Sequence, residues 1–353
     1  MTASAVSQRV VACLDARGRG VLTEQPTPDL TPGCVRLRVT ATMVSPGTQL
    51  NGVAAMRQGE KAGPDPAQPL GYQAAGVVVE VGAGVTRLSP GQRVACMGPG
   101  ALHTDVAVVP QNLCAVIPDN VTDDEASGVN LVLTALQAIR RTPCQLGEFA
   151  LIVGLGAVGQ LTGQFARSSG LYVMGWDMSA GRLETAKGLA ADAVANPRDE
   201  AMLEQCKAFT AGLGFDAAIL AIGGDGTPAL EQVKTVMKVT PDGHAMGHIT
   251  LVGGLTTTSQ WGAGMGNLDL HSSARSGPGY HDDAWEIGQT AYPQVFVRWT
   301  TQTNMQLALR MIADGRLRVD PLITHRLPLD AIDDAIASLV EQPDKTLAVV
   351  LKP

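Results

Sequence analysis

The sequence predicts an α/β protein in which a doubly wound parallel sheet is joined to a mostly antiparallel β domain. Three observations carry this prediction: an opening segment of short β-type runs broken by Gly and Pro, a middle segment in which strands alternate with helices, and a glycine-rich turn between one such strand and the next helix. The chain has 353 residues, which is enough for two domains.

Composition and charge narrow the class of protein. Charged residues make up only 17% and apolar residues 45%, which is typical of a globular core built from Ala, Val, Leu and Ile. The net charge of −7 argues against nucleic acid or an acidic membrane as a partner. No signal peptide pattern and no membrane-spanning apolar stretch is visible, and the six cysteines form no C-x-x-C pair. We therefore expect a cytoplasmic protein with reduced thiols.

The opening segment, residues 1–128, contains extended runs separated by breakers such as Thr31-Pro32-Gly33 and Pro90-Gly91. Many short strands with turn signals predict a mostly antiparallel barrel or sandwich. The expected strands are Val35–Val39, Ala75–Val81, Arg93–Cys96 and Thr104–Val109.

The middle segment, residues 129–275, is preceded by a capping box, Thr122-Asp-Asp-Glu125, which predicts one helix running on towards Arg141. Apolar strands and amphipathic helices then alternate, which is typical of a parallel sheet covered on both faces. The expected strands are Phe149–Val153, Tyr172–Asp177, Ala217–Ala221 and Ile249–Val252; the expected helices are Gly159–Ser168, Ala180–Leu189 and Thr227–Met237.

The last segment, residues 276–353, opens with a Gly/Pro/aromatic loop. Helices near Asn304–Ala313 and Asp330–Leu339 and a final strand, Thr346–Leu351, are expected to follow, and we predict that this segment completes the first domain.

The most informative motif is a G-x-G-x-x-G turn directly after the strand Phe149–Val153 and at the start of a helix. The first glycine allows a tight turn, the second allows close approach of a pyrophosphate, and the third allows the helix to pack on the strand. The amides at the helix start favour the anion. The predicted dinucleotide-binding residues of this turn are Gly154, Leu155, Gly156, Ala157, Val158 and Gly159.

A carboxylate, Asp177, ends the next strand about 20 residues further on. Such a carboxylate accepts hydrogen bonds from the adenosine ribose and repels a 2′-phosphate, so it favours NAD over NADP. Met178 and Arg182 follow it; Arg182 is able either to pair with a phosphate or to flank the ribose.

The whole chain resembles the medium-chain dehydrogenase/reductase superfamily. The resemblance rests on Leu70–Gly76, where relatives carry a Gly-His-Glu stretch, on the turn at Gly82–Val94, on Leu146-Gly147-Glu148 and on the glycine turn. It implies a GroES-like catalytic domain, a Rossmann NAD-binding domain, hydride transfer to or from a small-molecule substrate, and a homodimer. Further cofactor contacts are expected at the carboxyl ends of strands, in the loop after the last Rossmann strand and, by analogy, near the C-terminus: Ala221, Ile222, Val252, Gly253, Gly254, Ala274, Arg275, Ser276 and Lys345.

The resemblance also exposes a departure from the zinc-dependent members. Ser45, Tyr72 and Asn130 stand where those relatives hold catalytic zinc, and neutral hydroxyl and amide groups bind zinc poorly. The four cysteines of the structural zinc lobe are absent, and Met97–His103 runs through its place. We expect no metal at either site.

Without zinc, a hydroxyl or imidazole has to move the proton at the reacting oxygen. Tyr72 is the first candidate, although packing at the domain junction explains it equally well. Ser45 and Asn130 are expected to line the same pocket, and Thr134 to lie near the nicotinamide. Tyr280 and His281 are further candidates, because they follow a Ser-Gly-Pro-Gly loop able to close over substrate or merely to turn the chain.

Four other residues have a weaker case. His103 is a further candidate, whereas His271 falls in the last Rossmann strand and is more readily explained as structural. His244 and His248, four apart, are interpreted as loop residues because of the surrounding Pro241-Asp-Gly243 and Gly247.

Three functions stay open at this point. The first is a zinc-independent, NAD-dependent dehydrogenase acting on a secondary alcohol of a sugar- or cyclitol-like substrate, which the loop from Ala274 to Tyr280 favours by resembling a branch linked with sugar, polyol or pigment biosynthesis. The second is a zinc-free enoyl or quinone reductase using NAD(P)H. The third is a non-catalytic NAD-binding protein.

Overall fold

The structure is a computed structural model that describes residues 7–260 and 262–353. The chain divides into two compact units. Unit 1 comprises residues 1–133, 276–314 and 323–353, and unit 2 comprises residues 134–275 and 315–322. Within the described residues, every helix is too short or too polar to cross a bilayer.

Unit 1 is built mainly from antiparallel strands. A hairpin of β1 (Gln8–Leu14) and β2 (Gly20–Pro26), which the sequence analysis did not predict, pairs through β1 with the short β4 (Gln68–Pro69). A seven-stranded sheet has the order β17-β18-β3-β5-β6-β8, with β7 paired to β3. Its strands are β3 (Cys34–Val44), β5 (Gln73–Val81), β6 (Arg93–Met97), β7 (Val106–Pro110), β8 (Cys114–Val116), β17 (Ile323–Pro328) and β18 (Ala348–Lys352).

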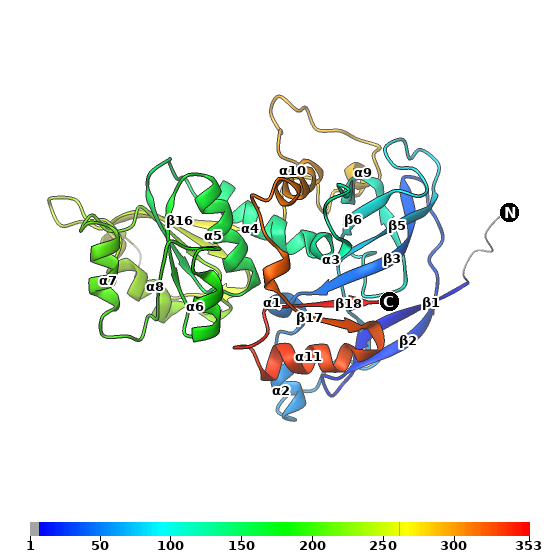
Figure 1. The fold of residues 1–353 in the computed structure, drawn as a ribbon, viewed down its shortest axis with the longest axis horizontal. Coiled ribbons are helices and arrows are strands. Elements are labelled where there is room, and N and C mark those ends of the chain that lie inside the picture. Colours follow the sequence, from blue (N-terminus) through cyan, green and yellow to red (C-terminus); the bar gives the residue numbers. More distant parts are fainter. Residues whose placement is uncertain (1–6, 261) are drawn as a thin grey trace. The chain divides into compact units, whose positions relative to one another are not determined.

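The C-terminal segment completes this sheet. β18 lies antiparallel to β3, with Val350 opposite Met43, so the last strand of the chain is held by one of the first (Figure 1). Helix α11 (Ile332–Glu341) packs its apolar face, including Ile336, into a core shared with Leu14 and Val349. All three of these side chains are buried, so the two ends of the sequence stabilise one another.

The single helix expected from Thr122 to Arg141 is two helices, and that prediction was wrong in its length. The capping box is present, with Thr122 accepting from the Glu125 amide, but α3 ends after one turn (Asp123–Ala126) and α4 spans Val129–Arg141. Gly128 lies at the break, where a Cβ would come within 2.6 Å of the Met43 sulfur. Only glycine fits at this close approach to the Met43 side chain without a shift of that side chain.

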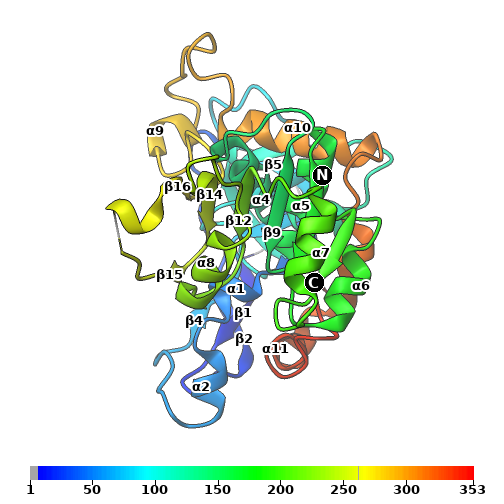
Figure 2. The ribbon, with the colours of Figure 1, turned by 90° about the vertical axis from the view of Figure 1, so that its left-hand side faces the viewer.

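Unit 2 contains a six-stranded parallel sheet with the order β11-β10-β9-β12-β14-β16 (Figure 2). In chain order this is 3-2-1-4-5-6, the doubly wound arrangement that binds dinucleotides where the strand order reverses, here between β9 and β12. The strands are β9 (Phe149–Val153), β10 (Tyr172–Trp176), β11 (Ala193–Ala195), β12 (Ala217–Leu220), β14 (Met246–Val252) and β16 (Asn267–Ser273).

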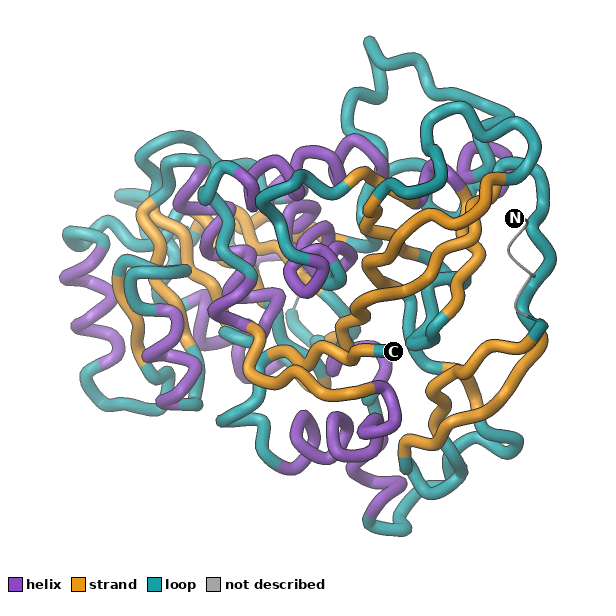
Figure 3. The backbone as a smooth tube through the Cα atoms, turned by 45° about the vertical axis from the view of Figure 1, so that its right-hand side comes forward, coloured by secondary structure: helices purple, strands orange, loops and turns teal. Residues whose placement is uncertain are grey.

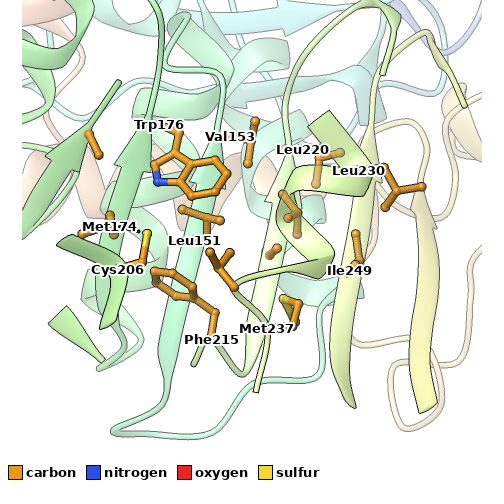
Figure 4. Close-up of a cluster of buried hydrophobic side chains, with 14 of the residues drawn as sticks. Leu151, Val153, Met174, Trp176, Cys206, Phe215, Leu220, Leu230, Met237 and Ile249 are labelled. Atoms are coloured by element: carbon orange, nitrogen blue, oxygen red, sulfur yellow. Dashed lines mark hydrogen bonds between the residues drawn. The ribbon is translucent and has the colours of Figure 1, made fainter. Parts of the chain in front are cut away.

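Helices cover both faces of this sheet (Figure 3). On one face, α4, α5 (Ala157–Ser168) and α6 (Ala180–Ala186) pack on alternate strand residues such as Ile152 and Ile219. On the other, α7 (Met202–Phe209) and α8 (Thr227–Lys234) pack on a core that includes Leu151 and Trp176 (Figure 4). Because both faces are buried, the inner strands β9, β10 and β12 are apolar, which is the pattern that predicted them.

One histidine is placed differently from the expectation. His244 lies in the turn before β14, as predicted, but His248 is inside β14 and pairs in register with Asp269 of β16. Gly247 lies inside the strand with a φ of 123° and does not end it. Glycine is required there because a Cβ would come within 2.5 Å of the Asp216 carbonyl oxygen. Glycine in this case marks a close backbone approach within the sheet.

Candidate active site

The three glycines of the turn after β9 have different surroundings. Gly154 has a φ of 87°, and a Cβ there would lie 2.5 Å from the Ile222 side chain. A Cβ on Gly159 would lie 1.8 Å from the Gly154 carbonyl oxygen, so only glycine lets α5 begin this close to the strand. A Cβ on Gly156 would meet nothing within 4 Å. Packing therefore requires the first and third glycines, and the second borders open space.

The start of α5 is suited to bind an anion. Gly156 is the N-cap residue and has no side chain to satisfy the amides of the first turn, to which Ala157 and Val158 belong. Unsatisfied amides at the start of a twelve-residue helix, together with its dipole, attract phosphate. Leu155 is fully buried, so its side chain serves the core.

The Asp177 carboxylate lies at the end of β10, directly beside this turn. Its Oδ2 accepts from the Leu155 amide at 2.7 Å, and its Oδ1 accepts from the Ser179 amide at 2.8 Å. Arg182 places its Nη1 3.7 Å from Oδ2, while Met178 is 58% exposed. Each carboxylate oxygen has a second acceptor direction, so Asp177 is able to accept from ribose hydroxyls as well.

The other predicted cofactor positions of unit 2 lie at the same sheet edge or in the loop after β16. Parallel strands bring their carboxyl ends to one edge, so the residues after β12 and β14 follow the same side as the glycine turn. Arg275 is exposed and has a φ of 63°, a conformation rare for a residue with a Cβ. The positions concerned are Ala221, Ile222, Val252, Gly253, Gly254, Ala274 and Arg275.

In unit 1, Ser45 and Tyr72, two of the three positions expected to replace the metal ligands, come together with a third hydroxyl group, that of Thr48, which the sequence analysis did not name. The Tyr72 hydroxyl hydrogen-bonds with the side chains of Ser45 and Thr48. Ser45 is buried and is the N-cap of α1 (Pro46–Gln49), whereas Thr48 is exposed. Burial raises the pKa of Tyr72, and the two hydroxyl neighbours only partly oppose this rise. At neutral pH Tyr72 is therefore protonated and donates a hydrogen bond.

His103 lies next to this group but is no proton donor to solvent. It is fully buried, with Nδ1 2.6 Å from Thr42 Oγ1 and Nε2 3.0 Å from Gln49 Oε1. Burial lowers the pKa of His103 to about 3, so the ring is neutral. Gln49 in turn accepts from the Ser45 amide at 3.1 Å. The buried imidazole therefore fixes α1, which carries Ser45 and Thr48.

Gln73 is a positioning residue that the sequence analysis missed. It is fully buried, its Nε2 donates to the Met43 carbonyl, and its Oε1 accepts from the amides of Asn130 (2.9 Å) and Leu131 (3.2 Å). The side chain thereby ties the start of α4, which carries Asn130, to β3 and β5. Thr134 follows four residues after Asn130 on the same helix. The signal for this role in the sequence was a polar residue, Gln73, directly after Tyr72 and before the apolar run that follows it in β5.

The loop after β16 contains residues with different environments. Tyr280 and His281 have ring centroids 3.9 Å apart, and His281 is exposed with a φ of 71°. Its amide donates to Glu286 at 2.7 Å, which holds the strained turn.

Two predicted cofactor contacts lie in unit 1. Ser276 is fully buried there, with its hydroxyl against the Met97 sulfur. Lys345 is exposed in the same unit.

Comparison with known proteins identifies the family. Residues 31–119 match the family model of the alcohol dehydrogenase GroES-like domain, and residues 157–277 match that of zinc-binding dehydrogenases. The chain belongs to the medium-chain dehydrogenase/reductase superfamily. Its two units are the GroES-like and Rossmann parts of that fold, and the chain is an oxidoreductase of the alcohol dehydrogenase type.

Sorbitol dehydrogenases are among the similar superfamily members. The enzyme of Gallus gallus is 25% identical over 93% of this chain and 92% of its own, and that of Mus musculus is 28% identical over 95% and 94%. Two solved structures share the fold. An Escherichia coli oxidoreductase of unknown specificity has a TM-score of 0.78 at 20% identity, covering 98% of this chain and 99% of its own; 2R,3R-butanediol dehydrogenase of Bacillus subtilis has 0.74 at 17%, with the same coverage.

The catalytic zinc found in many superfamily members does not fit the residues in unit 1. Ser45, Tyr72 and Asn130 supply neutral oxygen or amide groups, whereas zinc prefers thiolate, imidazole or carboxylate. The neighbouring imidazole of His103 has both ring nitrogens within hydrogen-bonding distance of other side chains. No part of the chemistry below is therefore assigned to a metal ion.

Proposed function

We propose that this protein is a zinc-independent, NAD-dependent dehydrogenase that interconverts a secondary alcohol and its ketone on a polyol-, sugar- or cyclitol-like substrate. The observation that carries the proposal is the hydrogen-bonded group of the Tyr72, Ser45 and Thr48 hydroxyls. By resemblance, Tyr72 and Ser45 correspond to positions where zinc-dependent members hold the metal. A cytoplasmic homodimer using the edge of β16 is part of the proposal, by resemblance to the superfamily.

The cofactor half of the proposal rests on unit 2. The open space at Gly156 and the amides of α5 would hold the pyrophosphate, and Asp177 would accept from the adenosine ribose. The negative charge of Asp177 disfavours a 2′-phosphate, so NAD is preferred over NADP. When bound, NAD accepts a hydride from the carbinol carbon or its reduced form returns one.

The chain's own task is to manage the proton at the substrate oxygen. In the reducing direction Tyr72, protonated because its pKa is raised, donates to the carbonyl oxygen and passes its proton to the oxygen as the alcohol forms. Ser45 and Thr48 stabilise the resulting phenolate by hydrogen bonds, and exposed Thr48 links Tyr72 to solvent, from which the proton is replaced. In the oxidising direction the same groups carry the proton outward.

The test is a hydride-transfer assay with the full chain. NAD⁺ is offered with polyols and cyclitols, and NADH is offered with the matching ketones and with conjugated enones, following nicotinamide absorbance. Turnover of polyols or ketones with NAD(H) is the expected result. Turnover of enones alone would instead support an enoyl or quinone reductase, and NAD binding without turnover of any compound would support a non-catalytic binding protein; either outcome overturns the proposal.

A further inference from the structure

A second cluster of polar, metal-ligating side chains lies in unit 2, on the neighbouring strands β14 and β16. His248 of β14 and Asp269 and His271 of β16 each offer one ligand atom, and these atoms lie within 4.8 Å of one another. Among the described residues this is the one group of three or more His, Cys, Asp or Glu with that property.

The sheet register explains why the three side chains meet. β14 and β16 run parallel with His248 opposite Asp269 and Thr250 opposite His271. Residues two apart on a strand project to the same face, so Asp269 and His271 both point to the face of His248. That face is the one covered by α4, because Thr250 hydrogen-bonds Thr142, the residue after α4, at 2.7 Å.

Two of the three separations between ligand atoms in the cluster match those between ligands of one small cation. His248 Nδ1 lies 3.2 Å from Asp269 Oδ2 and 3.4 Å from His271 Nε2. Zinc–ligand bonds of about 2.0–2.1 Å in a tetrahedron place ligand atoms about 3.3–3.4 Å apart. The two imidazole nitrogens also face each other, an arrangement that either a shared proton or a cation stabilises.

The chemistry of the donor set favours a divalent transition metal over Mg²⁺ or Ca²⁺. Two imidazoles and one carboxylate are ligands that suit zinc, whereas magnesium and calcium prefer all-oxygen sites. His248 is 30% exposed at its side chain and Asp269 66%, so an ion can enter and retain water as a fourth ligand. The positively charged side chain of Arg141 adjoins β16, where it donates to the Ser272 carbonyl at 3.2 Å.

We propose that His248, Asp269 and His271 form a zinc-binding site in the Rossmann unit. The site is distinct in its residues from the catalytic zinc position of the superfamily, whose counterparts Ser45, Tyr72 and Asn130 belong to unit 1. The ion is held by strands at the edge of the sheet, so its role is to bind β16 to β14.

The test is a calorimetric titration of the chelator-treated full chain with zinc chloride, repeated with cobalt(II), whose visible bands report tetrahedral coordination. Wild-type protein is expected to bind one ion per chain. His271→Gln and Asp269→Asn are each expected to weaken binding at least tenfold, since each removes a ligand and leaves two. Asp269 is exposed and its replacement is isosteric, so this variant folds even where His271→Gln does not.

The matched control is His244→Gln. His244 and Asp242 form another His–Asp pair in unit 2, also with a 3.2 Å separation, but without a second imidazole. This variant is expected to bind zinc as the wild type does. The proposal is overturned if the wild type takes up no zinc or cobalt, if His271→Gln and Asp269→Asn both retain wild-type affinity, or if His244→Gln is the variant that loses binding.

Discussion

The carboxylate of Asp177 accepts a hydrogen bond of 2.7 Å from the backbone amide of Leu155, and so ties the end of β10 to the glycine turn after β9. Its other oxygen accepts from the Ser179 amide, at the cap of α6. One side chain thus supports three elements around the proposed nucleotide site. Its two functions, shaping the turn and carrying a negative charge, can be separated by substitution.

Asp177→Asn is expected to narrow the preference for NADH over NADPH by about tenfold, or about 1.4 kcal/mol. The amide keeps an acceptor oxygen for the Leu155 amide but loses the charge that repels a 2′-phosphate. The measurement is a nicotinamide fluorescence titration with both cofactors, with the melting temperature as a control for folding. An unchanged ratio of the two dissociation constants would remove Asp177 from cofactor choice.

Gly156→Ala and Gly159→Ala are expected to differ although both alter the same turn. A Cβ at position 156 meets no protein atom within 4 Å, so this variant should keep its stability and lose NADH affinity at least tenfold, because the methyl group occupies the ligand's space. A Cβ at position 159 meets the Gly154 carbonyl at 1.8 Å, so that variant should lose about 3 kcal/mol of stability. Urea unfolding and NADH titration separate the two effects; equal behaviour would contradict the assignment.

Tyr72→Phe is expected to lower turnover by about 10²–10⁴-fold while leaving NADH affinity unchanged, because it removes only the group that moves the proton. Since burial raises the pKa of Tyr72 above 10, ketone reduction by the wild type should persist to that pH and decline only beyond it, as the proton is lost. Steady-state rates across alkaline pH check both points. Wild-type turnover in the Phe variant would exclude Tyr72 as the donor.

His103 is expected to make the protein sensitive to acid. Its pKa in the folded state is about 3, below the ordinary value of about 6.5, so between these limits the unfolded chain binds a proton that the folded chain does not. The contribution of His103 to the free energy of unfolding is fully present above pH 6.5. It falls by about 1.4 kcal/mol per pH unit below that value, which amounts to about 2 kcal/mol at pH 5. Urea unfolding at pH 7 and pH 5 measures this loss. His103→Asn should show a shallower dependence, and an identical slope would refute the account.

Removal of metal ions is expected to leave turnover unchanged. Ser45, Tyr72 and Asn130 offer no strong zinc ligand, so the reaction has no metal to lose. The measurement is the rate before and after chelator treatment, made on Asp269→Asn so that the proposed site in unit 2 does not contribute. A zinc-dependent superfamily member treated in parallel serves as the control, and loss of activity restored by zinc in this chain would contradict the prediction.

Much of the fold was predictable because its signals are local. The run Phe149–Val153 and the glycine turn that follows it predict a strand, a turn and a helix from neighbouring residues alone, and the structure contains β9 and α5 there. The same is true of the capping box at Thr122. Its helix was nevertheless predicted too long, since α3 ends at Ala126 and α4 begins at Val129.

The sequence by itself determined the superfamily and the glycine turn, and it carries the prediction that the metal ligands are replaced, since each depends on residue identity at fixed spacing. Only the tertiary structure decided which side chains meet. Gln73 reaches the start of α4, His103 supports α1, and His248 joins Asp269 and His271 across a strand pair. These contacts join residues that lie 21 to 58 positions apart in the sequence. They are set by strand register and packing, and local sequence patterns do not encode either of these.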